Sequence, residues 1–559
     1  MTHANHDQVL VNHLGYPLDS PISLVYQTKN TKTLEENRFV IVDPNLKPIH
    51  EFQLDPKPIS NWHTGHCQRL QLPPLPLGFY GIVNSQQQMK ATFNVVDPYQ
   101  ETLVETLADY FFNQRSQGAV DDFDHQVPLF GEREHGVIDA HGGWFDASGD
   151  VSKYLSHLSY ANYLAPQQIP LVVWCLIRAS QFQSSETLKA RLVNEALFGA
   201  SFLLRMFSSD HYFYQIVFDR WSKDVNQRSI CNYATQKGFK SERWECSFRQ
   251  GGGMAIAALA ACARLAQGFG DSELLNQCKA VAISGFEHLL SNNHHYHDNG
   301  RANIIDDYCA LLAAVELFGA TGQAQFKKSI EEFAQQLVNK QTPHGHYNGY
   351  WRVEEHYQRP YFHASDSGLP LMALAEAYRV LPLPEVKDCL EKQWQLSHQI
   401  SHESFNPFGY PRHLVNGNQE LKSQFFFPHE NESGYWWQGE NARLGSLACA
   451  AQFCSPLLSQ QQQGFAEQLH WDCQNWLLGL NPFGACMIEG LGRNNPQYRP
   501  DYPGLAGGIC NGITSSLTNE ADIALCETDD PNHNWRWGEQ WIPHAAWWLL
   551  SFSMASSRR

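Results

Sequence analysis

The segment Gly142-Gly143-Trp144-Phe145-Asp146-Ala147-Ser148-Gly149-Asp150 places two carboxylates four residues apart on a glycine-flanked loop. Two carboxylates held close together can bind one water and take its proton, and glycine allows the positive φ values that such a turn requires. A purely structural alternative is an Asx turn with a helix cap, because Asp150 precedes a helical-looking run over residues 151–163. Residues further along the chain decide between these interpretations.

A third acidic residue, Glu539, lies in the segment Trp535-Arg536-Trp537-Gly538-Glu539-Gln540-Trp541. Apolar surroundings raise the pKa of a glutamate, so this side chain can stay protonated near neutral pH and donate to a leaving-group oxygen. The alternative is a glutamate in the first turn of a helix, where it complements the helix dipole. The three neighbouring tryptophans and the distant Asp pair favour a general acid.

Short runs of alternating apolar and polar residues fill residues 1–97 and predict a small β-sandwich. Asp97-Pro98 marks its end, because the residue before a proline avoids the helical region. We therefore expect two domains, 1–97 and 98–559. The predicted strands are Val9–Val11, Ser23–Gln27, Phe39–Val42, Phe79–Val83 and Thr92–Val96.

Helix-length apolar runs recur through residues 98–559, so the expected fold class is mainly α. About a dozen such runs suggest six antiparallel helical hairpins closed into a double ring. The runs are 101–114, 151–163, 171–182, 186–207, 252–269, 272–290, 302–318, 325–339, 367–380, 385–400, 434–453, 460–478 and 541–553.

The composition excludes several classes of partner. A net charge of -17 argues against nucleic acid and favours neutral or cationic ligands. The 14 cysteines form no CxxC pair and the N-terminus has no signal-like region, so we expect reduced thiols in a cytoplasmic protein. No run approaches the roughly 20 apolar residues of a membrane span. The 26 histidines form no HExxH motif, so we expect no metal in the site and no cofactor, and the sequence leaves a structural cation open. The oligomeric state stays open.

Several motifs resemble those of glycoside hydrolase family 9, the inverting cellulase-type enzymes. Residues 142–154 resemble the family's GGW-aromatic-DAGD-x-x-K-Y segment. Residues 478–482 and 490–496 resemble its LGxNP and GxGxNxP blocks, and Glu539 fits its terminal NE-x-x-I-x-x-x-A helix. Residues 12–17 resemble the start of the immunoglobulin-like module that precedes many such catalytic domains. The resemblance therefore covers the whole chain.

This resemblance implies an (α/α)6 barrel behind an immunoglobulin-like β-sandwich, with Asp150 as general base and Glu539 as general acid. Asp146 would hold the water or the substrate. Inversion leaves room for a water, so the two catalytic carboxyl groups should stand roughly 6.5 to 9.5 Å apart. Aromatic and polar neighbours suit sugar binding, with core packing as the alternative for the aromatics. The candidate substrate-binding residues are Trp144, Trp436, Trp437, Tyr498, Arg499 and Trp537.

Three departures from the cellulase pattern bear on the substrate. Ala-Ser-Gly separates the two aspartates where cellulases have Ala-Gly, Tyr498-Arg499 stands in place of a His-Arg pair, and Gly538 replaces an Asn. The longer loop resembles a bacterial subgroup of exo-β-D-glucosaminidases, which remove glucosamine from chitin-derived disaccharides. In such an enzyme, Asp146 could pair with the 2-ammonium group.

We therefore expect an exo-β-D-glucosaminidase that acts on small oligosaccharides. The runner-up is a β-1,4-glucanase or a cellobiose-cleaving exo-glucosidase of the same family. A carbohydrate-binding protein without catalysis is disfavoured, because both Asp150 and Glu539 are present.

Overall fold

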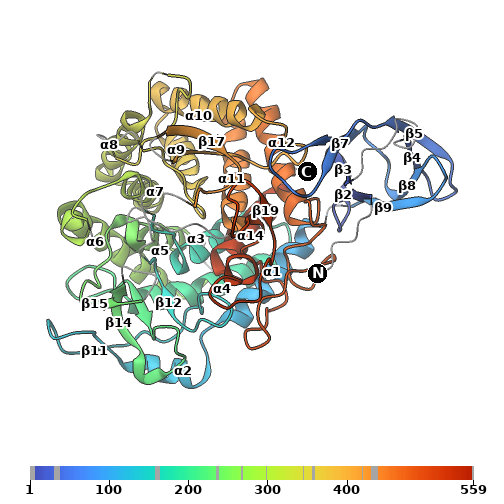
Figure 1. Ribbon diagram of the computed structural model, residues 1–559. Helices are drawn as coiled ribbons and strands as arrows, with labels where there is room; N and C mark the ends of the chain where they lie inside the picture. Colours follow the sequence, from blue (N-terminus) through green and yellow to red (C-terminus); the bar gives the residue numbers. More distant parts are fainter. Residues whose placement is uncertain are drawn as a thin grey trace.

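The computed structural model describes residues 7–29, 38–97, 99–157, 164–233, 238–265, 269–297, 299–343, 345–354, 359–417, 420–429 and 439–556. A small lobe of strands lies beside a larger helical body (Figure 1). The last strand of the lobe ends at Val96 and the first helix begins at Gln100. The chain is thus mainly helical with an N-terminal sheet region, as the sequence predicts.

Two sheets form the N-terminal lobe, with strand orders β1-β3-β7-β6 and β2-β9-β8-β4-β5. Alternate side chains of both sheets meet in one apolar cluster that includes Tyr26, Ile82 and Phe93. The strands are β1 (Gln8–Leu10), β2 (Tyr16–Pro17), β3 (Ile22–Thr28), β4 (Arg38–Val42), β5 (Pro48–Gln53), β6 (Lys57–Pro58), β7 (His66–Leu72), β8 (Gly78–Asn84) and β9 (Met89–Val96).

Six helices of the described chain form an inner ring. Each packs on the next, from α3 through α5, α7, α9 and α11 to α14, and α14 packs on α3. These helices are apolar on nearly all sides, which is the pattern of a helix buried among other helices. They are α3 (Ile169–Ser180), α5 (Gly253–Cys262), α7 (Ile304–Thr321), α9 (Leu369–Val380), α11 (Asn441–Cys454) and α14 (Ile542–Ser556).

An outer helix covers each inner one, in the pairs α4 on α3, α6 on α5, α8 on α7, α10 on α9, α12 on α11 and α1 on α14. The outer helices bury one stripe, as Phe326, Ile330, Ala334 and Leu337 of α8 illustrate at near-helical spacing. The outer helices are α1 (Gln100–Gln114), α4 (Glu186–Arg205), α6 (Ser272–Tyr296), α8 (Ala324–Lys340), α10 (Pro384–His402) and α12 (Gln460–Leu477).

Short elements connect the rings. A sheet of order β12-β13-β14-β15 lies in the helical body. The strands are β10 (Val127–Pro128), β11 (Val137–Ile138), β12 (Lys153–Tyr154), β13 (Ile216–Phe218), β14 (Ser229–Tyr233), β15 (Lys240–Ser241), β16 (His413–Gly417), β17 (Glu420–Gln424), β18 (Thr514–Ser515) and β19 (Ile523–Ala524). The helices are α2 (Gly118–Phe123), α13 (Trp535–Gly538) and the single turns η2 (Asp124–Gln126), η3 (Val225–Gln227), η4 (Phe248–Gly252) and η5 (Ser455–Leu457).

The helix predicted for residues 151–163 is wrong in its described part. Lys153 and Tyr154 instead pair with Val217 and Ile216 as strand β12. Tertiary pairing with β13 overrides the local apolar pattern here, and residues 158–163 lie outside the described chain. The Asp pair is therefore followed by a strand.

The strand lobe is attached to the helical body by polar contacts with α12. Arg69 donates from both terminal guanidinium nitrogens to Asp472, at 3.0 and 2.6 Å, and Asn12 donates to Asn475 at 2.9 Å. Within the described residues, no helix combines the length and apolar character needed to cross a bilayer.

Candidate active site

Polar residues that precede the inner helices are hydrogen-bonded to one another at one end of the ring. The Gln167 N–H donates to Asp366, before α9, at 3.0 Å, and its Nε2 donates to the Arg249 carbonyl, before α5, at 2.7 Å. The Arg249 N–H donates to Asp306, in the first turn of α7, at 3.2 Å. Helix N-termini leave N–H groups without helical partners, so this end of the ring suits a polar site.

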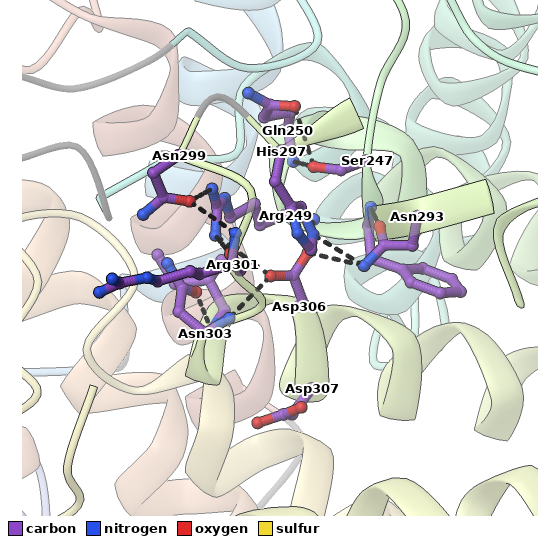
Figure 2. Close-up of polar contacts among 12 residues, drawn as sticks. Ser247, Arg249, Gln250, Asn293, His297, Asn299, Arg301, Asn303, Asp306 and Asp307 are labelled. Carbon is purple, nitrogen blue, oxygen red and sulfur yellow. Dashed lines mark hydrogen bonds and ion pairs between the residues drawn. The ribbon is translucent and has the colours of Figure 1, made fainter. Parts of the chain in front are cut away.

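Figure 2 shows the buried cluster around Arg249 and Asp306. The Arg249 guanidinium contacts Asp306 at 3.4 Å and donates to the Arg301 carbonyl at 2.8 Å. Asp306 forms a capping box with Asn303 at the start of α7. The cluster holds the starts of α5 and α7 together, and the Arg249 carbonyl holds Gln167 by accepting a hydrogen bond from its side chain.

Asp146 is buried and held by two donors. Trp541 Nε1 lies 3.0 and 3.1 Å from its two carboxylate oxygens, and Gln168 Nε2 also donates to it. Burial raises the pKa of Asp146 well above its usual value, and the charges of Asp150 and Glu539 raise it further. The three carboxyl groups are thus close enough to influence one another.

Asp150 also lies in a buried position. Its Oδ1 accepts the Ser152 N–H at 2.8 Å, which is an Asx-turn contact, and its Oδ2 accepts the Tyr154 hydroxyl at 3.2 Å. Burial raises the pKa of Asp150 to about 6, the nearby Asp219 charge adds to this, and the two hydrogen bonds oppose it. Asp150 therefore makes the turn that the sequence allows, but the described residues 151–157 that follow it form no helix.

Glu539 lies between the single turn of α13 and the start of α14, so it is not a first-turn helix residue. Loss of water contact raises the pKa of Glu539 to about 8, the Asp150 charge adds to this, and a hydrogen bond from the Asn511 side chain opposes it. The direction agrees with the prediction from its apolar neighbours. A glutamate with this pKa is mostly protonated at neutral pH.

Direct hydrogen bonds join the Asp loop to the Glu539 segment. Ser148 N–H donates to the Gln540 carbonyl at 2.9 Å, and the Gln540 N–H donates to Ser148 Oγ at 2.8 Å. Ala147 pairs with Trp541 as an isolated bridge. The residues between the two aspartates therefore align the loop with the third carboxyl group.

This arrangement provides a proton donor and a proton acceptor at neutral pH. Glu539 carries a proton that it can donate, while Asp150 is mostly ionised above pH 6 and can accept one. Two carboxyl groups whose pKa values differ in this way can act as the acid and base pair of a hydrolysis.

Tyr498 and Arg499 lie on a turn near Glu539. The Glu539 charge contributes to the raised pKa of Tyr498, although burial is the larger cause. Arg499 forms a bidentate ion pair with Asp501 at 2.9 and 2.5 Å. A Cβ on Gly538 would lie 2.9 Å from Tyr498 Cα, so this turn leaves no room for a side chain there.

Two predicted sugar-binding tryptophans are core residues instead. Trp144 and Trp537 are both 0% exposed. Trp144 also donates from Nε1 to Glu195 at 2.9 Å, behind the Asp loop. A ring without an exposed face cannot stack on a sugar, so these two predictions are wrong. Trp436 and Trp437 lie outside the described residues.

Four further residues hold the candidate carboxyl groups and were not singled out from the sequence. Gln168 donates to Asp146, Tyr154 to Asp150 and Asn511 to Glu539. Asp219 accepts a hydrogen bond from Ser152, which in turn holds Asp150. These four residues come from four separated segments of the chain. Only Tyr154 could have been found from the local sequence, because it is the last residue of the glycine-rich motif at residues 142–154.

One group of potential metal ligands occurs among the described residues. His125, Asp139 and His141 offer donor atoms that all lie within 4.8 Å of one another. The group lies at the surface on the segment before Gly142, and none of its members contacts a candidate catalytic carboxyl group. The expectation of no cofactor stays a prediction.

Comparison with known structures supports the same fold. A metagenome-derived glycoside hydrolase family 9 endoglucanase has a TM-score of 0.68 at 17% identity, covering 99% of each chain. A Bacteroides ovatus family 9 protein has a TM-score of 0.66 at 16% identity, covering 98% of each chain. A thermostable endoglucanase mutant from Alicyclobacillus acidocaldarius has a TM-score of 0.65 at 14% identity, covering 99% of this chain and 100% of its own.

Comparison with curated protein sequences gave no significant match. The model of glycosyl hydrolase family 9, in contrast, matches residues 99–501, which is well over half of the chain. The match includes Asp146 and Asp150 and ends before Glu539. The chain therefore belongs to glycosyl hydrolase family 9.

Proposed function

We propose that this glycoside hydrolase is an inverting exo-β-D-glucosaminidase that cleaves β-1,4 bonds in small glucosamine-containing oligosaccharides. We assign its two rings of helices to the (α/α)6 barrel class and its N-terminal lobe to the immunoglobulin-like modules. Asp150 is the general base and Glu539 the general acid. The order of their pKa values, about 6 and about 8, supports these roles.

The proposed reaction balances its protons between the two carboxyl groups. Asp150 takes a proton from a water that attacks the anomeric carbon, and Glu539 gives its proton to the departing glycosidic oxygen. The water oxygen becomes the new anomeric hydroxyl on the opposite face. A separation of roughly 6.5 to 9.5 Å between the two groups is the corresponding geometric prediction.

The observation that carries the amino-sugar assignment is the charge around Asp146. Burial raises the pKa of Asp146 and the charges of Asp150 and Glu539 raise it further, while no Lys or Arg of the described chain forms an ion pair with any of these three carboxyl groups. A cationic ligand among these groups would relieve the repulsion and favour ionised Asp146. The 2-ammonium group of glucosamine is a cation of suitable size.

A β-1,4-glucanase or a cellobiose-cleaving exo-glucosidase is the second candidate. It is favoured by the descriptions of the three structurally similar proteins reported above, two of which are endoglucanases. At 14 to 17% identity these similarities establish the fold and leave the sugar open.

Hydrolysis of glucosaminyl-N-acetylglucosamine against cellobiose tests the assignment. We expect a higher kcat/KM on the glucosaminyl disaccharide, with release of the α-anomer in a time-resolved NMR assay. Faster cleavage of cellobiose would refute the amino-sugar assignment, and release of the β-anomer would refute inversion.

An Asp146→Asn variant provides the matched comparison, because it removes the charge and keeps the shape. We expect this variant to lose preference for the amino sugar more than it loses activity on cellobiose. Equal losses on both substrates would contradict a role for Asp146 in recognising the ammonium group.

A further inference from the structure

A turn of the β13–β14 connection folds toward the Asp loop. Arg220, Trp221 and Lys223 all have positive φ values, of 60°, 59° and 58°. Non-glycine residues adopt this conformation at a cost, so the surrounding structure must hold it. Asp219 does so, because its side chain accepts the N–H groups of Trp221 and Lys223 at 3.0 and 2.7 Å.

The same Asp219 is linked to the candidate base. Ser152 Oγ donates to Asp219 at 3.0 Å, while the Ser152 N–H donates to Asp150 at 2.8 Å. The conformation of the turn that carries Lys223 is therefore coupled to the position of the Asp150 carboxylate.

Tyr502 contacts both the Asp loop and the turn that carries Lys223. Its ring lies directly on Gly149, where an added Cβ would be 2.3 Å from the ring, and Gly149 has a φ of +82°. Lys223 Nζ lies 3.9 Å from the centre of the Tyr502 ring, and the Arg499 guanidinium lies 4.4 Å from it. Two cations thus hold one aromatic ring against the Asp loop.

The segment that carries Tyr502 also reaches the candidate acid. Tyr498 packs with Tyr502 at a ring distance of 6.0 Å and lies close enough to Glu539 to feel its charge. Residues 498–502 therefore run along one side of the site, from the acid to the base.

We propose that Tyr502, held on Gly149 by Lys223, is a specificity-determining wall that closes one side of the sugar-binding site and restricts the enzyme to short substrates. This proposal rests on the proposed glycosidase site at Asp150 and Glu539. Beyond that site, the proposal names the residues that limit the length of the substrate. The wall depends on Gly149, one of the three residues that separate the two aspartates, because any side chain there would displace the ring.

Substrate length is the direct test. We compare kcat/KM for a tetrasaccharide with kcat/KM for the matching disaccharide, in both the glucosamine and the glucose series. In Tyr502→Ala, we expect this ratio to rise about tenfold, because loss of the ring opens that side of the site to a longer chain. In Lys223→Ala, we expect a smaller rise, because the ring stays but loses a cation that holds it.

Two controls separate the wall from general damage. Tyr502→Phe keeps the ring and should keep the native ratio. Lys189, on α4, is another lysine that lies over an aromatic ring, with its Nζ 5.3 Å from the centre of the Phe269 ring. Lys189→Ala should also leave the ratio unchanged.

The proposal is overturned if folded, active Tyr502→Ala and Lys223→Ala both keep the native length ratio. Should Tyr502→Ala fail to fold, Lys223→Ala decides alone, because Lys223 is exposed. Failure of the amino-sugar assignment would appear as a preference for the glucose series, and the length ratio within that series would still test the wall.

Discussion

Ser148 and Gln540, 392 residues apart in the sequence, are joined by two hydrogen bonds of 2.8 and 2.9 Å. Ser148 lies between Asp146 and Asp150, and Gln540 directly follows Glu539. One short contact therefore sets the relative position of all three candidate catalytic carboxyl groups. Proton transfer depends steeply on such positioning.

Ser148→Ala should lower kcat about tenfold with little change in KM, because it removes the Oγ acceptor and loosens the alignment of base and acid. Steady-state kinetics on the preferred disaccharide measure this. Ser201→Ala is the control, since Ser201 Oγ donates within its own helix, to Leu197 at 2.9 Å. A native kcat in Ser148→Ala would show that the backbone bond alone aligns the segments.

Asp150→Ala and Glu539→Gln should each lower kcat/KM on natural disaccharides by about 100-fold or more, as removal of a general base or acid does. Aryl glycosides with good leaving groups need no proton from the enzyme, so they should restore much of the Glu539→Gln activity and none of that of Asp150→Ala. Glu332→Gln, on the exposed side of α8, is the control. Equal rescue of both variants would contradict the division of roles.

The pH profile of kcat/KM should be bell-shaped, with limbs near pH 6 and pH 8, because Asp150 must be ionised and Glu539 protonated. The Asp219 charge contributes to the raised pKa of Asp150, so Asp219→Asn should move the acid limb to lower pH. Rate measurements from pH 4 to 10 test both statements. A limb that moves upward in Asp219→Asn would contradict the sign.

Glu539→Gln should raise thermal stability at pH 9 and leave it nearly unchanged at pH 4. The folded pKa of Glu539, about 8, lies above its unfolded value near 4.5, so ionisation costs folding free energy as pH rises between these values. Differential scanning calorimetry should show a Tm increase of a few degrees at pH 9. A lower Tm at pH 9 would mean that the native carboxylate is stabilised by its surroundings.

Trp144→Phe should lower stability and leave KM nearly unchanged, because Trp144 packs in the core and donates to Glu195. Loss of that hydrogen bond leaves a buried carboxylate acceptor with one donor fewer, at a cost of about 1 to 3 kcal/mol. Urea denaturation and substrate titration measure the two effects. A large rise in KM at native stability would restore Trp144 as a sugar-binding residue.

Local patterns in the sequence were enough to find the helical body, the N-terminal strands and the carboxyl groups Asp146, Asp150 and Glu539. Periodicity reports which face of an element is buried, and the glycine-flanked Asp pair and the tryptophan-rich Glu segment are each continuous. The same patterns misjudged residues 151–157 and the two buried tryptophans. An apolar run does not say which partner it meets, and a tryptophan suits a core as well as a sugar.

The tertiary structure alone decided how the separated segments act together. Ser148 meets Gln540, Tyr502 rests on Gly149, and Gln168 and Trp541 hold Asp146, in each case across long stretches of chain. The pKa values of the carboxyl groups also arise from burial and from charges that only folding brings near. The sequence thus determined which carboxyl groups are candidates for catalysis. Packing determined the distances between them and their protonation, because both depend on contacts between residues distant in the chain.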